Sequence, residues 1–211
     1  MTMSTAATTA SETAVCWSCG TATADTTTFC AACGLVQPPG QSDHFARLAQ
    51  PRSFDIDAAG LDRRYFELQR QLHPDRFARK TAREKAISQQ QAAALNEAYE
   101  TLKNPLRRAR YLAQQRGVDL PGEGRTIDDP ELLMEAMERR EALAESTTVS
   151  AVQALESTAQ EERAGLLQGL SAQFAANDKS GVRAAILRLA YLDKFTEEAR
   201  ARRFNLGASG Q

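Results

Sequence analysis

The pattern of apolar and polar positions divides the chain into helical stretches separated by proline and glycine. In the middle region, apolar residues recur at the i, i+4, i+7, i+11 spacing of one helix face, and Arg and Glu occupy the other side. Asp57 can cap the start of this helix, and Pro74 must end it, because the residue before a proline disfavours α-helical backbone. The predicted inward positions are Leu61, Tyr65, Leu68 and Leu72.

A second helix of the middle region is predicted over residues 82–103, where the Asn-Pro pair at 104–105 stops it. The proline fits the first turn of a further short helix that ends near Gln115. The region is therefore expected to form two antiparallel helices around a loop at residues 73–75, followed by a short helix. The inward positions of the second helix are predicted to be Ile87, Ala94, Leu95, Ala98 and Leu102.

The C-terminal region predicts three further helices with short connections, which favours an antiparallel bundle. Asp129 and Pro130 fit the N-cap and the first position of one helix, which ends near Glu145. The other two are predicted over residues 150–176 and 182–204. The turn between them is predicted at Asn177, Asp178 and Gly181, and the inward positions of the second helix are Val152, Leu155, Ala159, Leu166, Leu170 and Phe174.

Composition narrows the class of protein. A chain of 211 residues is long enough for one large domain or for two to three small ones. The formal net charge of −1 argues against a general nucleic-acid binder, which needs a basic surface. No apolar run approaches the length of a membrane span.

The opening stretch MTMSTAATTASETA has no Lys, no Arg and no apolar core, so we expect a disordered tail, no secretory signal and a bacterial cytoplasmic location. The mitochondrial matrix stays open, because a processed form would have lost its presequence.

All four cysteines form two CxxC pairs, each followed by glycine. The pairs are Cys16-Trp-Ser-Cys19 and Cys30-Ala-Ala-Cys33, with ten residues between them. Two such pairs can complete a tetrahedral Cys₄ site, and this spacing is typical of one structural zinc ion with no open position for catalysis. Two disulfides, redox-active pairs and an iron–sulfur site are the alternatives, and a cytosolic setting disfavours the disulfides. Because the segment is too short to bury a core, the metal would supply most of its folding energy.

The tripeptide His73-Pro74-Asp75 permits two interpretations. In the simpler one, the proline ends a helix, the aspartate caps the next turn and the histidine is an ordinary surface residue. In the other, a rigid turn between two helices holds the imidazole and the carboxylate outward, where Asp75 could accept two hydrogen bonds from an arginine of a partner. Basic side chains of the preceding helix could then meet an acidic partner surface, and these are Arg63, Arg64 and Arg70.

The helix after Pro130 has two unlike faces when positions are placed at about 100° per residue. Leu132, Ala136 and Leu143 form a core stripe. The opposite side mixes apolar residues with carboxylates, and its members are Leu133, Met134, Met137, Glu138, Glu141 and Glu145. Exposed apolar residues rimmed by charge are typical of a surface that binds a partner, and Met adapts well to such surfaces. Alternatively, Met134 only contacts the middle region and the glutamates are a solvated face.

Several segments resemble one known family. YFELQRQLHPDRF and ALNEAYETLKNPLRRARYLA closely resemble the J-domain of the HscB-type iron–sulfur cluster co-chaperones. DPELLMEAMERREALAE and LRLAYLDKF are similar to C-terminal segments of that family, and the Cys₄ segment resembles the module of its animal members and of some bacterial ones. The resemblance covers residues 14–205.

The resemblance implies a mainly α fold. A J-domain with an antiparallel helical hairpin would be joined, in an L shape, to a C-terminal three-helix bundle, with a small Cys₄ zinc knuckle before both. The expected division is a disordered tail at 1–13, the Cys₄ zinc-binding module at 14–36, the J-domain at 43–116, a linker at 117–129 and the scaffold-binding domain at 130–206.

The resemblance also implies a role in iron–sulfur cluster biogenesis. J-domains stimulate ATP hydrolysis by a DnaK-type chaperone, here of the dedicated HscA type or a mitochondrial counterpart, and the HscB bundle delivers an IscU-type scaffold protein to it. The implied chaperone-binding residues are His73, Pro74 and Asp75, supported by Arg63, Arg64 and Arg70. The implied scaffold-binding residues are Leu133, Met134, Met137, Glu138, Glu141, Glu145 and Tyr191, the last at a position where relatives can carry Phe.

Other classes fit less well. An enzyme is not expected, because His44 is the only other imidazole, no Gly-rich phosphate loop is present and the cysteines fit a metal site. A general J-protein that delivers misfolded clients would usually carry Gly/Phe-rich linkers and β-rich client domains. Nucleic-acid binding by the Cys₄ segment is disfavoured because residues 14–36 contain no Lys or Arg. We expect neither a nucleic-acid nor a membrane partner.

Overall fold

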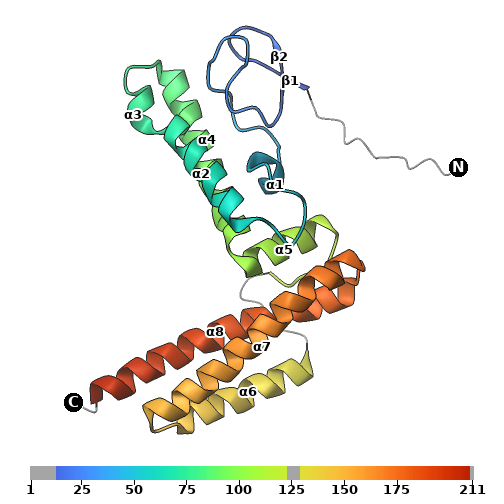
Figure 1. Cartoon of the computed structure of the whole chain (residues 1–211), viewed down its shortest axis with the longest axis vertical. Coiled ribbons are helices and arrows are strands. Elements are labelled where there is room, and N and C mark those ends of the chain that lie inside the picture. The colour runs from blue at the N-terminus through green and yellow to red at the C-terminus, as the bar shows by residue number, and fades with distance from the viewer. Residues whose placement is uncertain (1–12, 123–128, 210–211) are drawn as a thin grey trace, which may run out of the picture. The chain divides into compact units, whose positions relative to one another are not determined.

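The computed structural model describes residues 13–122 and 129–209, and these are mainly helical, which confirms the predicted fold class (Figure 1). Almost all of the predicted disordered tail and the middle of the predicted linker lie outside the described residues. The elements are β1 Thr13–Val15, β2 Ala22–Ala24, α1 His44–Arg47, α2 Ala58–Leu72, α3 Pro74–Phe77, α4 Ala82–Lys103, α5 Pro105–Gln115, α6 Pro130–Glu145, α7 Val149–Ala175 and α8 Lys179–Ser209.

The predicted helix ends are accurate where a proline or a capping side chain marks them. The carboxamide of Asn104 accepts hydrogen bonds from the backbone N–H groups of Leu106 and Arg107 at the start of α5. In the same way, Asp129 accepts from the first turn of α6. Local side-chain chemistry therefore fixes these boundaries.

The start and the end of the last helix were predicted wrongly. Residue Gly181 lies in the first turn of α8 rather than in the preceding turn, because the carboxylate of Asp178 accepts its N–H at 2.9 Å and begins the helix there. The reversal itself occurs at Asn177, whose φ of 53° is the left-handed conformation that ends α7. The helix also continues to Ser209, beyond the predicted end at 204.

Two four-residue helices, α1 and α3, have no counterpart among the predicted helices. In α1, the carboxylate of Asp43 accepts the N–H of Ala46 at 2.8 Å. Phe45 and Leu48 are completely buried, and α1 packs against α4. One helical turn is too short to produce a periodic pattern, so the sequence gives no periodic signal for it.

The chain divides into two compact units. The first contains the residues up to Arg52 together with Ile56–Lys103, and the second contains Ser53–Asp55 and the chain from Asn104 onward. In the first unit, α2 and α4 are antiparallel, and the rings of Tyr65 and Tyr99 stack at 3.9 Å between centroids. The predicted positions Leu61, Leu68 and Leu72 are buried on α2. This hairpin holds the loop at residues 73–75 at one end.

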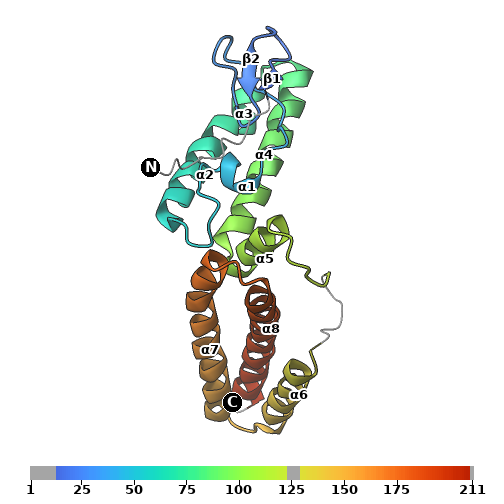
Figure 2. The same cartoon turned by 90° about the vertical axis from the view of Figure 1, so that its right-hand side faces the viewer.

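The second unit contains the predicted three-helix bundle of α6, α7 and α8 (Figure 2). Its core includes Leu132 and Leu143 of α6, as predicted, together with Phe195 of α8. Two arginines add ion pairs between the helices: Arg188 pairs with Glu135 and Glu162, and Arg139 pairs with Glu162. Helix α5 also packs against α8 in this unit. Within the described residues, no helix has both the length and the apolar character needed to cross a membrane.

Candidate functional site

The two CxxC pairs form two turns with the same backbone geometry. In the first, the N–H of Gly20 donates to the carbonyl of Cys16 at 3.0 Å, and in the second Gly34 donates to Cys30 at 2.8 Å. Both glycines have a φ of 72°, a conformation that residues with a side chain rarely adopt. Each turn is therefore a glycine-closed knuckle that presents two sulfur atoms.

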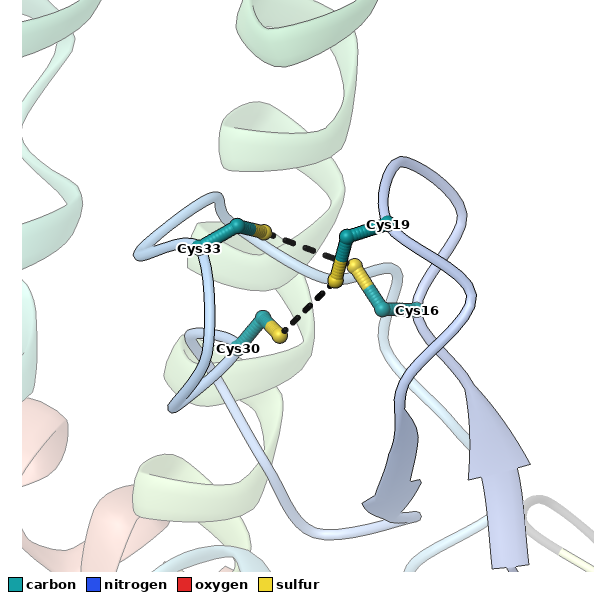
Figure 3. Close-up of side chains that lie close together, drawn as sticks. All are labelled: Cys16, Cys19, Cys30 and Cys33. Atoms are coloured by element: carbon teal, nitrogen blue, oxygen red, sulfur yellow. Dashed lines mark hydrogen bonds between the residues drawn. The ribbon is translucent and has the colours of Figure 1, made fainter.

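The four sulfur atoms converge (Figure 3). All lie within 4.8 Å of one another, and the Cys16–Cys33 and Cys19–Cys30 Sγ atoms are each separated by 3.7 Å. A disulfide needs about 2.05 Å, so neither pair is bonded. Metal–sulfur bonds of about 2.3 Å in a tetrahedron place the sulfurs about 3.8 Å apart. The arrangement therefore fits a single metal ion held by four protein ligands.

The thiols of this cluster have divergent acidities. Backbone N–H groups of Cys19 and Ser18 help to lower the pKa of the Cys16 thiol to about 6. The N–H of Leu35 acts to lower the pKa of Cys33, but desolvation and the three neighbouring sulfurs raise it to about 12. Four sulfurs at this spacing repel one another once ionised, so a cation is needed to hold all of them as thiolates.

The cysteine module, residues 14–36, is attached to α4 by contacts that the sequence analysis did not anticipate. The guanidinium of Arg83 lies 4.3 Å from the ring centroid of Trp17, whose indole N–H donates to the carbonyl of Val36 at 2.7 Å. Just beyond the module, the buried amide of Gln91 donates to the carbonyl of Gln37 at 2.8 Å. These contacts join residues that lie far apart in the sequence. The one sequence signal for them is the group of polar residues on the inward side of α4, which are Glu84, Ser88 and Gln91.

The His73-Pro74-Asp75 turn is ordered by its own side chains. His73 has φ −55° and ψ 134°, the extended backbone expected before a proline, and so ends α2. Its Nδ1 accepts the backbone N–H of Asp75 at 3.3 Å and caps α3. The His73 and Asp75 side chains remain 57% and 90% exposed. The backbone of the turn is thus held by the proline and by this cap, and its two functional side chains are open to solvent.

The three predicted arginines of α2 are not equally available. Arg63 is exposed and lies 3.3 Å from the carboxylate of Asp57, whereas Arg64 pairs with Glu67 at 3.0 Å. Arg70 is exposed in the last turn of α2, next to the His-Pro-Asp turn. The same helix also exposes 52% of Phe66, which the sequence analysis did not single out.

The predicted outer face of α6 is solvent-exposed. Leu133, Met134 and Met137 are 38%, 65% and 71% exposed, and they are among the largest exposed apolar side chains of the described residues. Glu138, Glu141 and Glu145 are exposed as well. The structure therefore brings these six residues together on one helix, as an apolar strip beside carboxylates. We call this set the α6 face.

Tyr191 has a different environment from the rest of the predicted scaffold-binding set. It is only 7% exposed, and its hydroxyl donates to the carbonyl of Ala136 on α6 at 3.2 Å. Burial raises the pKa of this phenol. The structure therefore places Tyr191 beneath α6, where it supports the helix from the core side.

Comparisons with known proteins give consistent results. The family model "HSCB C-terminal oligomerisation domain" matches residues 128–200. The chain is 38% identical over 161 residues to the co-chaperone protein HscB homolog of Cupriavidus taiwanensis, covering 75% of this chain and 92% of the relative. It is 31% identical over 187 residues to the mouse iron–sulfur cluster co-chaperone protein HscB, covering 87% and 80%. The crystal structure of human co-chaperone protein HscB superposes with a TM-score of 0.83 at 30% identity, covering 90% of this chain and 98% of the human one.

Proposed function

The chain belongs to the HscB family of iron–sulfur cluster co-chaperones, and we propose that it stimulates ATP hydrolysis by a DnaK/HscA-type chaperone while delivering an IscU-type scaffold protein to it. Its general role is that of a co-chaperone in iron–sulfur cluster biogenesis. One observation carries the finer proposal: three large apolar side chains, Leu133, Met134 and Met137, are exposed on a single helix of the second unit. Exposed apolar residues beside carboxylates are typical of a surface that binds a partner protein.

The first unit supplies the chaperone contact. Because Nδ1 of His73 accepts the N–H of Asp75, the neutral imidazole carries its proton on Nε2, which is left to donate to the chaperone. The Asp75 carboxylate, 90% exposed, is available to an arginine of the chaperone, and Arg63 and Arg70 add positive charge on the preceding helix. The chain itself breaks no bond. It favours the arrangement in which the chaperone hydrolyses its own ATP.

The second unit supplies the scaffold contact. Met134 and Met137 offer adaptable apolar surface, and the exposed carboxylates of Glu138, Glu141 and Glu145 would pair with basic groups around an apolar patch on the scaffold. Tyr191 holds α6 in place from below and so positions this face.

We propose that the metal held by Cys16, Cys19, Cys30 and Cys33 is zinc. Zinc accepts four thiolates in a tetrahedron and supplies folding energy to modules without a core of their own. With four protein sulfurs as ligands, no position is left for a substrate, so the ion stabilises the knuckles. Metal analysis of the purified protein tests the assignment: about one equivalent of zinc supports it, and iron with its visible absorption contradicts it.

The substitution His73→Gln tests the chaperone contact. It should abolish stimulation of the chaperone ATPase in a single-turnover assay, because the amide cannot reproduce both the cap of α3 and the outward N–H. Helix content and scaffold binding should match the wild type, since the side chain is exposed. Unchanged stimulation would remove the turn from the mechanism.

The alternative is a general J-protein that delivers misfolded clients. Suppression of luciferase aggregation, compared with capture of the purified scaffold, separates the two. We expect scaffold capture without suppression of aggregation.

A further inference from the structure

A groove of about 480 Å³ lies between the second cysteine knuckle and the helices that flank the His-Pro-Asp turn. Phe29, Leu35 and Val36 line it from the cysteine module, and Phe77 of α3 lines it from the other side. Val36 and Phe77 are buried, while Phe29 and Leu35 are partly exposed. The exposed apolar surface of the groove therefore comes mainly from Phe29 and Leu35 of the cysteine module, and both sides of the groove belong to the same compact unit.

Positive charge surrounds this groove. Arg76 and Lys80 are part of its lining and are exposed. Within the part of the chain that the structure describes, the side chain of Arg76 has no hydrogen-bond or ion-pair partner, and Lys80 Nζ lies 4.0 Å from a carboxylate oxygen of Glu84. Residues 76–85 contain the cations Arg76, Arg79, Lys80, Arg83 and Lys85, with Glu84 as the single acid.

The acid in the groove, Glu84, is engaged by local contacts. Its carboxylate accepts the backbone N–H of Thr81 at 3.0 Å and the Thr81 hydroxyl at 2.8 Å. The backbone N–H and the hydroxyl of Thr81 lower the pKa of this buried carboxyl, which stays ionised and engaged within α4. Apart from the four metal-binding cysteines, residues 14–36 contain one charged side chain, Asp25, and none of these five residues is part of the lining. The charged residues of the lining are Arg76, Lys80 and Glu84, so the groove carries an excess of one positive charge beside its apolar surface.

We propose that this groove binds an acidic, apolar segment of the same chaperone that the His-Pro-Asp turn engages. The proposal rests on the proposed function. Arg76 lines the groove and directly follows Asp75 in the chain, so a chaperone that binds Asp75 lies next to the groove. The charge of the groove selects an acidic segment, and its apolar wall at Phe29 and Leu35 selects one that also carries large hydrophobic side chains. The cysteine module is then one wall of the chaperone-docking site.

The contacts between the cysteine module and α4 link the metal site to the groove. Trp17 under Arg83 and Gln37 bonded to Gln91 fix the module against α4, and the knuckle from Cys30 to Cys33 holds Leu35 at the groove. Without the ion, the knuckles lose their main source of order and the wall is lost. Metal removal should therefore weaken chaperone docking even though His73 and Asp75 are unchanged.

The test compares two substitutions in the full chain, Leu35→Glu and Val15→Glu. Leu35 lines the groove, whereas Val15 lies on β1 of the same module, is 68% exposed and is not part of the lining. A carboxylate at position 35 would occupy the cationic groove and repel an acidic segment. ATPase stimulation of the purified DnaK-type chaperone from the same organism is measured against co-chaperone concentration, with bound metal quantified in each variant.

We expect Leu35→Glu to raise the half-maximal concentration at least fivefold while the maximal stimulation and scaffold binding are retained, and Val15→Glu to behave as the wild type. A metal-loaded Leu35→Glu protein with a wild-type curve overturns the inference and leaves the proposed function intact. Absence of stimulation by the wild-type chain overturns both.

A second measurement applies if Leu35→Glu loses its metal. A benzoylphenylalanine photo-crosslinker replaces Leu35, and the protein is irradiated with the ATP-bound chaperone and the scaffold together. A crosslink to the chaperone supports the inference. Crosslinks only to the scaffold or to a second copy of this chain overturn it.

Discussion

The exposed methionines of the α6 face allow a quantitative prediction for scaffold binding. Burying a whole Met side chain contributes about 1.5–3 kcal/mol. Since 65% of Met134 and 71% of Met137 are exposed in the free protein, a partner that covers them gains about 1–2 kcal/mol from each. The double substitution Met134→Ala and Met137→Ala should remove about 2–4 kcal/mol, which raises the dissociation constant about 30- to 700-fold.

Isothermal titration calorimetry with the purified IscU-type scaffold measures this change. Phe204→Ala is the matched control, because Phe204 is a large apolar residue of the same unit, 77% exposed on α8 and outside the α6 face. Neither variant should unfold more easily, since the truncated groups are exposed and alanine favours the helix. A change below threefold for the double variant, with helix content intact, would refute the assignment of the α6 face.

Three further predictions concern the supports of these sites. Tyr191→Phe should cost about 0.5–1.5 kcal/mol of stability in urea unfolding and keep scaffold binding, because only the hydrogen bond to Ala136 is lost. Tyr191→Ala should cost roughly 3–5 kcal/mol of stability and weaken scaffold binding. If both variants weaken scaffold binding equally, the hydroxyl itself contacts the scaffold. Chelation of the metal at neutral pH should red-shift the fluorescence emission of Trp17, the single tryptophan. The far-ultraviolet circular dichroism signal of the helices should stay almost unchanged. A parallel loss of helix signal would contradict an α2–α4 core that folds independently of the metal. Burial acts to raise the pKa of the Glu162 carboxyl, but hydrogen bonds from Arg188 and Arg139 lower this pKa overall. The ion pairs of Glu162 therefore stabilise the fold above the unfolded pKa of about 4.3, and this contribution is lost as the pH falls through the lower folded pKa. Glu162→Gln should therefore destabilise the protein by about 1–2 kcal/mol at pH 7 and by much less at pH 3, and a pH-independent difference would exclude the ion pairs as its cause.

The helical framework could be predicted because its signals are local. Caps such as Asn104 and Asp129 act within one turn, and the stripes that follow them have the period of a buried helix face. The start of α8 could not be placed, because Gly181 is compatible with both a turn and a first helical turn. Only the hydrogen bond to Asp178 decides between them.

The sites could be predicted only in part. The convergence of four cysteines follows from their spacing, and the exposure of Met134 and Met137 follows from helical angles. Tyr191 lies with Leu187, Phe195 and Ala199 on an i, i+4 apolar stripe of α8, so helical periodicity favoured its burial, whereas the resemblance placed it in the scaffold-binding set. The docking of Gln37 on Gln91 joins positions 54 residues apart and leaves no periodic trace in the sequence. The roles of the individual residues, and the bacterial cytoplasmic location, stay predictions.

We propose that one chain couples scaffold binding to ATP hydrolysis by a chaperone. The most direct test is the steady-state ATPase rate of the purified DnaK/HscA-type chaperone, measured with the scaffold, with this protein, and with both. We predict that both together stimulate more than the product of their separate effects. His73→Gln should abolish this synergy, and the double substitution at Met134 and Met137 should remove the synergy but keep the stimulation by the chain alone. If the separate effects simply multiply, and neither variant alters the result, the chain does not couple scaffold binding to ATP hydrolysis.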